Sequence, residues 1–307
     1  MSPMNRRAFL ARGGAAAAVG MLAGRMAVAQ DAPATPQVVI FSKYLQFMDY
    51  KTLARTCREI GLDGVDLTVR PGGHVLPENV DRDLTAAVEA IRAEGLSVPM
   101  ISTNYYDLEG PNVTGVFARA AALGIPFVRV GVRRYDDDGP IAPQAAKFTE
   151  DLAALAKLAA ESGLTLGYHN HSGWNNFGGP LWDLHQACAA VNSPHFGSNF
   201  DTAHTAAEGA FGVWQVNTRL LAPYVKMSSA KDFVWKGAEP EWVRLGQGVV
   251  KNVDMYRILR TLGGFSGPVS IHIEYRPKGG GKDGMVEEIR ATVPILRGIL
   301  KEAGYPA

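Results

Sequence analysis

The segment Glu59-Ile60-Gly61-Leu62-Asp63-Gly64-Val65-Asp66-Leu67 joins the end of a predicted helix to a short apolar run through a glycine. Glycine suits the left-handed backbone position that follows a helix, and a continuous apolar run is typical of a strand buried on both faces. The order recurs at a spacing of about 30 to 40 residues, which is typical of a strand–helix unit. The later copies cover residues 94–101, 123–130, 162–168 and 263–271.

Three further apolar runs complete the predicted set of strands, at residues 38–42, 196–200 and 224–229. The clearest helical patterns cover residues 50–60, 83–94, 143–162 and 287–303. Eight strand–helix units in roughly 270 residues predict a (β/α)8 barrel, the TIM barrel fold. A doubly wound open sheet is the alternative, but no glycine-rich nucleotide loop follows the first strand.

The composition excludes several classes of protein. The chain has 307 residues, of which 47% are hydrophobic, and 31 Lys and Arg against 30 Asp and Glu give a net charge of +1. This balance gives no electrostatic reason to expect a nucleic acid as partner. Two cysteines are too few for a disulfide scaffold or a thiolate zinc site. The oligomeric state stays open, a homo-oligomer included.

The first 29 residues have the order of an export signal. The pair Arg6-Arg7 precedes an apolar run over residues 13–24, and Ala27-Val28-Ala29 has the small-x-small pattern of a cleavage site. The paired arginines resemble a twin-arginine signal, which predicts cleavage after Ala29 and a periplasmic location. The apolar run is shorter than the ~20 residues of a membrane span, so no stable anchor is expected. Residues 30–37 are then an exposed lead-in, and residues 38–307 a single barrel domain.

Polar motifs follow the last four predicted strands, where barrel enzymes place their chemistry. Residues two apart on a strand project to the same side, so His169 and His171 can both point into the barrel mouth. His272 and Glu274 form a second such pair. Together with His204 and Asp201, these imidazoles and carboxylates indicate a metal site.

With these motifs the chain resembles the xylose isomerase-like TIM barrel superfamily, also described as the sugar phosphate isomerase/epimerase family. The resemblance covers the whole predicted mature chain. Its best matches are residues 168–171, 200–204, 231–233, 246–249 and 272–275. It implies a small carbohydrate substrate and a divalent metal ion, which could be manganese, cobalt, magnesium or zinc.

The resemblance also implies a ligand set with one position in doubt. Asp201 and Glu274 match family ligands, and His169 stands where the family has a glutamate after strand five. Ser229, a poor ligand, stands where the family has a histidine after strand seven. A degenerate site without metal therefore stays open.

The implied chemistry is proton transfer next to a carbonyl group, because a bound cation stabilises the developing enediolate oxygen. Glu274 is the predicted base, and His171 and Lys231 are the other predicted catalytic groups. The predicted substrate contacts are His204, His272 and Trp174. The loss of a carboxylate at His169 favours one-sided chemistry, such as isomerisation or elimination, over symmetric epimerisation.

Two alternatives stay open: a lyase or hydrolase of 3-keto-glycosides, and a non-catalytic periplasmic sugar-binding protein. The aromatic residues Trp174, Phe233 and Trp235 are expected in loops after strands five to seven, where they could stack on a sugar ring. The glycine-rich residues 278–282 lack the full phosphate-loop pattern and are expected to form a flexible surface loop.

Overall fold

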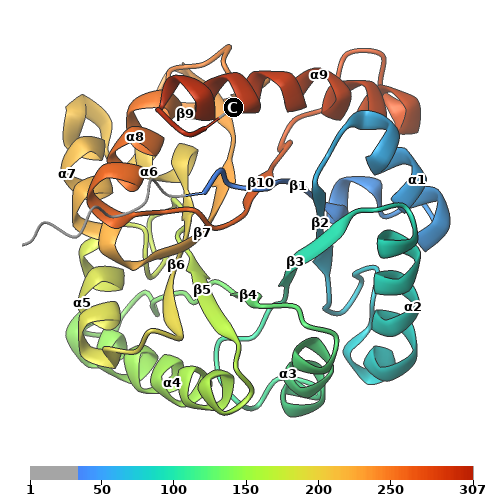
Figure 1. Ribbon diagram of the computed structural model, residues 1–307. Helices are drawn as coiled ribbons and strands as arrows, with labels where there is room; N and C mark the ends of the chain where they lie inside the picture. The colour runs from blue at the N-terminus through green and yellow to red at the C-terminus, as the bar shows by residue number, and fades with distance from the viewer. Residues whose placement is uncertain (1–33, 307) are drawn as a thin grey trace, which may run out of the picture. The chain divides into compact units, whose positions relative to one another are not determined.

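The computed structural model describes residues 34–306, and the predicted export signal lies outside this range. Within it, eight parallel strands close into a barrel in the order β1-β10-β7-β6-β5-β4-β3-β2, and the helices surround them (Figure 1). The predicted (β/α)8 barrel is confirmed, and the open-sheet alternative is wrong because the first and last barrel strands pair with each other.

The barrel strands are β1 (Val38–Phe41), β2 (Gly64–Thr68), β3 (Ser97–Ser102), β4 (Phe127–Val130), β5 (Thr165–His169), β6 (Phe196–Asp201), β7 (Val225–Ala230) and β10 (Val269–Ile271). The α-helices are α1 (Tyr50–Ile60), α2 (Val80–Ala93), α3 (Val113–Ala122), α4 (Ile141–Glu161), α5 (Trp182–Val191), α6 (Thr202–Glu208), α7 (Val213–Leu221), α8 (Asn252–Gly263) and α9 (Gly281–Glu302). Within residues 34–306, no helix combines the length and the apolar character that a bilayer span requires.

Helix α1 shows how the repeated sequence pattern forms a strand–helix unit. The Asp49 carboxylate accepts a hydrogen bond from the backbone N–H of Thr52 and caps the first turn. The buried face presents Leu53, Cys57 and other apolar side chains to the barrel. Gly61 ends the helix at φ +87°, a backbone conformation that favours glycine.

The barrel interior contains a small cluster of apolar side chains and a buried carboxylate. Val39, Met100 and Met227 form the fully buried apolar group. The Asp66 carboxylate accepts hydrogen bonds from Ser102 at 2.7 Å and from Ser270 at 2.8 Å. Since β2 and β10 flank β1 on opposite sides, the Asp66–Ser270 bond passes over β1 and links the two strands that pair with it.

A short antiparallel hairpin, which the sequence analysis missed, follows β7. It consists of β8 (Asp232–Lys236) and β9 (Glu239–Val243), which pair across a two-residue turn that begins at Gly237. Phe233 and Trp235, which were expected in a loop, both lie in β8. The hairpin brings Trp242 of β9 over the barrel mouth.

We predict that Asp66 makes stability depend on pH. Burial raises the pKa of Asp66 to about 6, against about 3.9 in an unfolded chain. The folded state therefore binds the proton more tightly, and the free energy of unfolding should rise by about 3 kcal/mol as the pH falls from above 6 to below 4. Urea unfolding across this range should show that Asp66→Asn removes the rise.

The control is Ser102→Ala, which removes a donor that stabilises the ionised carboxylate. It should move the same rise to higher pH without abolishing it. If Asp66→Asn leaves the pH profile of the wild type unchanged, the carboxylate is not the titrating group.

Candidate active site at the barrel mouth

The carboxyl ends of four neighbouring barrel strands supply the candidate site. His169 is the last residue of β5, Asp201 the last of β6, and Lys231 directly follows β7. Glu274 lies three residues beyond β10, and its side chain is 29% exposed, whereas those of the other three are almost fully buried. The structure thus brings these predicted residues together on one face of the barrel.

Asp201 uses its two carboxylate oxygens differently. Its Oδ1 accepts a hydrogen bond from the backbone N–H of His204 at 2.8 Å and caps α6. Its backbone N–H donates to Asn170 Oδ1 at 2.7 Å, which fixes the end of β6. Oδ2 takes no part in the helix cap and is paired with the Lys231 ammonium at 3.2 Å. Helix capping therefore aims one oxygen of Asp201 at the barrel mouth.

The Lys231 ammonium lies at the centre of the site. Its Nζ is 3.2 Å from Asp201 Oδ2 and 3.8 Å from Glu274 Oε1, and it donates to His204 Nε2 at 2.8 Å. Because an ammonium only donates, His204 Nε2 is the acceptor, and Nδ1 carries the hydrogen that is shared with Ser172 Oγ at 2.8 Å. A buried charge is tolerated when it is paired in this way.

His169, Asp201 and His204 each offer a ligand atom, and these atoms all lie within 4.8 Å of one another. Burial lowers the pKa of both imidazoles well below the usual value, and nearby cations, Arg129 and Lys231 among them, lower it further. Both rings are therefore neutral, and each has a nitrogen lone pair that could bind a metal; the lone pair of His204 accepts the hydrogen bond from Lys231 in this structure. Two imidazole nitrogens and one carboxylate oxygen fit a divalent transition metal.

This donor set differs from the one predicted from the sequence. His204, predicted as a substrate contact, belongs to the set because the first turn of α6 places it beside Asp201. Glu274, predicted as a ligand, lies outside the set and contacts Lys231 instead. Ser229 is buried, and its hydroxyl points to Asn199 Oδ1 at 3.5 Å.

Glu274 is held as a carboxylate. Tyr44 donates a hydrogen bond to Oε1 at 3.1 Å, and Lys43 Nζ lies 3.8 Å from Oε2. Burial alone would raise the pKa of Glu274, but Lys231, Lys43 and the Tyr44 hydroxyl outweigh it and lower the pKa. Glu274 is therefore ionised at neutral pH.

The remaining predicted residues lie in three different surroundings. His171 stacks near His204 with ring centroids 3.8 Å apart, and its Nδ1 donates to the Ser172 carbonyl, so Nε2 is its free lone pair. His272 is buried against Phe41, and neither of its ring nitrogens has a hydrogen-bond partner. Trp174 is 82% exposed in the loop after β5, and its contact with substrate stays a prediction.

Two residues that the sequence analysis did not select complete the site. Trp242 packs edge-on against His204 at 5.3 Å, and Lys231 Nζ lies 4.8 Å from the centre of its ring. Arg129 is 9% exposed, and its Nε and Nη1 have no hydrogen-bond partner. Arg129 could have been found from the sequence, because a charged residue inside the apolar run that forms β4 is unusual. Trp242 could not, because its position depends on the hairpin that the sequence analysis missed.

The family model described as Xylose isomerase-like TIM barrel matches residues 54–295. The chain belongs to this family. No curated protein shows significant similarity to the sequence.

Solved structures with the same fold share little sequence with this family member. D-psicose 3-epimerase from Clostridium cellulolyticum H10, solved with D-tagatose, is 14% identical with a TM-score of 0.66, covering 86% of this chain and 99% of the other. A probable 3-DHS dehydratase from Bacillus anthracis is 14% identical with a TM-score of 0.65, covering 83% and 98%. A protein from Mycobacterium smegmatis in complex with magnesium is 16% identical with a TM-score of 0.65, covering 88% and 99%. At these identities the likeness establishes the fold alone.

We predict that Lys231 competes with a metal ion for the donor set, because its ammonium contacts Asp201 Oδ2 and His204 Nε2 directly. Lys231→Met removes a positive charge next to the cation and should tighten the binding of Mn²⁺ or Zn²⁺ by about tenfold or more. Isothermal titration of the metal-stripped protein measures this change.

Lys147→Met is the control, since Lys147 pairs with Asp151 on the distant helix α4. It should bind the metal as the wild type does. Equal affinity of Lys231→Met and wild type would show that the ammonium does not compete, and no binding by either would remove this donor set as a metal site.

Proposed function

We propose that this protein is a sugar-modifying enzyme that moves a proton at a carbon next to a carbonyl group. The proposal rests on one observation: the partly exposed, ionised carboxylate of Glu274 lies 3.8 Å from the buried ammonium of Lys231. A base beside a fixed positive charge is what such a reaction requires. The sugar epimerase and the dehydratase that share the fold support the choice of reaction class.

Glu274 would take the proton from the carbon. The electron pair of the broken C–H bond then forms a carbon–carbon double bond, and the negative charge moves to the carbonyl oxygen. Lys231 would stabilise this oxygen, because its ammonium lies 3.8 Å from Glu274. The ammonium is itself buried, so little water screens its charge. A fixed charge in such surroundings acts more strongly than it would in bulk water.

Among the described residues at the ends of the barrel strands, Glu274 supplies the one accessible carboxylate of the site, which limits the reactions that the site can catalyse. Asp201 is completely buried beneath Lys231 and cannot serve as a second base on the opposite face of a sugar. Glu274 can return its proton to the former carbonyl carbon while the hydroxyl on the adjacent carbon passes its proton to the enediolate oxygen, and this double transfer gives isomerisation. In elimination, the substituent β to the carbonyl leaves with its bonding electrons and takes a proton from Lys231. We favour these one-base reactions over two-base epimerisation.

A divalent cation fits the donor atoms of His169, Asp201 and His204, and we propose these residues as its ligands. Such an ion would displace the Lys231 ammonium from Asp201 Oδ2 and His204 Nε2, and it would supply the positive charge that polarises the substrate carbonyl. Asp201 Oδ2 supports this assignment, because this buried carboxylate oxygen already holds a positive charge, the Lys231 ammonium at 3.2 Å.

We also propose that the protein acts in the periplasm after export by the twin-arginine route. Replacing both Arg6 and Arg7 by lysine should retain the uncleaved chain in the cytoplasm, because the arginine pair is the recognised feature. Cell fractionation and immunoblotting measure the distribution. Normal export of this double variant would contradict the proposed route.

We predict that Glu274→Gln strongly slows proton exchange. In D₂O, the wild type should incorporate deuterium next to the carbonyl of a methyl 3-keto-glucoside, followed by NMR. Loss of the base should slow this by about 10² to 10⁴. Glu94→Gln is the matched control, since Glu94 pairs with Arg58 at 2.7 Å just before β3, at the opposite end of the barrel from the site. Exchange by Glu274→Gln at the wild-type rate would contradict the assignment of the base. Binding of the sugar by the wild type without any exchange would favour a sugar-binding protein.

A further inference from the structure

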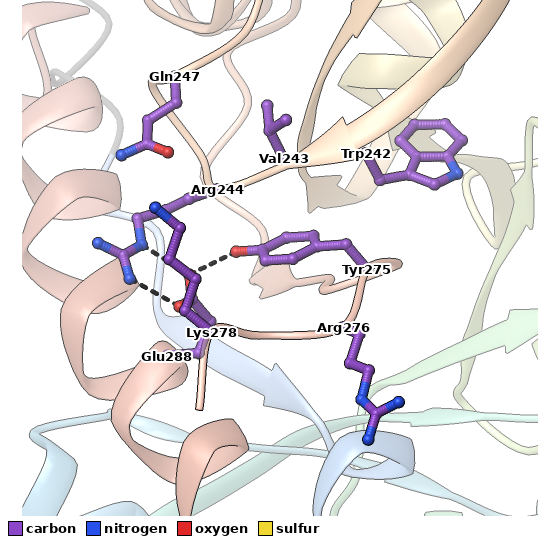
Figure 2. A pocket seen from close by; sticks show the side chains of 8 residues that line it. All are labelled: Trp242, Val243, Arg244, Gln247, Tyr275, Arg276, Lys278 and Glu288. Carbon is purple, nitrogen blue, oxygen red and sulfur yellow. Dashed lines mark hydrogen bonds and ion pairs between the residues drawn. The ribbon is translucent and has the colours of Figure 1, made fainter. Parts of the chain in front are cut away.

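Two cavities adjoin at the barrel mouth and share two aromatic walls, Trp242 and Tyr275. The first, of about 370 Å³, is lined by Glu274 and by residues of the hairpin. The second, of about 210 Å³, lies beyond Trp242 and Tyr275 and is drawn in Figure 2. Since a water molecule takes about 30 Å³ of liquid, the second cavity has room for a group the size of one ring.

The second cavity carries excess positive charge. The Arg244 guanidinium binds the Glu288 carboxylate through two bonds of 2.6 Å, so its charge is already neutralised. Lys278 and Arg276 also line the cavity, and among the described residues neither has a carboxylate within ion-pair distance. An anionic group of a ligand would find an unpaired cation here.

Figure 2 separates the two cations by direction. The Lys278 ammonium lies on the same side as Arg244 and the Gln247 amide, whereas the Arg276 side chain points away from them. Lys278 and Gln247 therefore form the polar end of the cavity, and the aromatic rings of Trp242 and Tyr275 form the side next to Glu274. An aromatic wall beside polar groups suits a ring that stacks on one face and carries a charged substituent.

The position of Gln247 is fixed by the backbone. The Asp232 carboxylate accepts hydrogen bonds from the N–H groups of Gly246, Gly248 and Val250, at 3.0 to 3.1 Å. A side chain at residue 248 would collide with this carboxylate, because an added Cβ would lie 2.1 Å from Asp232 Oδ1. The loop that carries Gln247 is therefore held in one conformation before any ligand binds.

We propose that the second cavity is a subsite for the leaving group of a glycoside, and that this group is a ring that carries a carboxylate. The reacting sugar would lie over Glu274, the second ring would pass between Trp242 and Tyr275, and its carboxylate would reach Lys278 and Gln247. The inference rests on the proposed function, since Glu274 is assigned there as the base. It selects glycosides over free monosaccharides as the substrate class.

The test compares two glycosides that differ only in charge: 4-carboxyphenyl and 4-carbamoylphenyl β-D-glucopyranoside, titrated calorimetrically into the full-length mature protein. The wild type should bind the carboxylate about fivefold more tightly, as expected for a partly exposed ion pair. Lys278→Ala should bind both equally. Lys282→Ala is the matched control; its ammonium lies over the Phe47 ring and outside the cavity, so it should keep the preference. The preference should shrink as salt is added.

Equal binding of the two glycosides by the wild type, binding of neither, or a preference retained in Lys278→Ala would overturn the subsite. A different result would show that the subsite exists but that the proposed function is wrong. The wild type would then prefer the carboxylate through Lys278, yet it would exchange no proton with any keto-glycoside.

Discussion

The site depends on the pairing of β1 with β10, which closes the barrel. Val38 lies opposite Val269 and Ile40 opposite Ile271, so the two ends of the domain run in register. This register places Tyr44, just after β1, beside Glu274, just after β10, and the two are joined by a hydrogen bond across 230 positions of sequence. An open sheet made of the same strands would separate Glu274, the proposed base, from the tyrosine that donates a hydrogen bond to it.

Burial controls the charges at the mouth. The histidines there are kept neutral because water is excluded from them and because cations lie nearby. The side chain of Lys231 is only 3% exposed, and its charge is tolerated there because Asp201, Glu274 and His204 surround the ammonium. The result is one accessible anion next to one buried cation, a polarity that the surrounding protein fixes in advance of any substrate.

The fold could be predicted because its signals are local. Each unit carries its own helix, glycine stop and apolar strand, and α1 has the predicted bounds, residues 50–60. The gathering of His169, Asp201 and Lys231 was also predictable, since parallel strands end on the same face of a barrel.

The role of His204, the hairpin and the position of Trp242 could not be predicted, because they depend on contacts that residue spacing does not reveal. His204 joins the donor set only because Asp201 caps α6 and turns the chain there. The hairpin lacks a clear apolar alternation, because Trp235, Lys236 and Glu239 are all exposed. Trp242 reaches back to Lys231 through that hairpin, so its role was hidden as well.

The single carboxylate of Asp232 also makes residues 232–250 a closed module. Its bonds to the loop tie the beginning of the hairpin to the segment that leaves it, so both ends of the insertion are anchored at one point on the barrel. The turn at Gly237 lies at the free end, remote from that anchor. Insertions or deletions at this tip would change the reach of the hairpin over the mouth while the barrel strands keep their register, which makes the module a natural place for related barrels to diverge in what they accept.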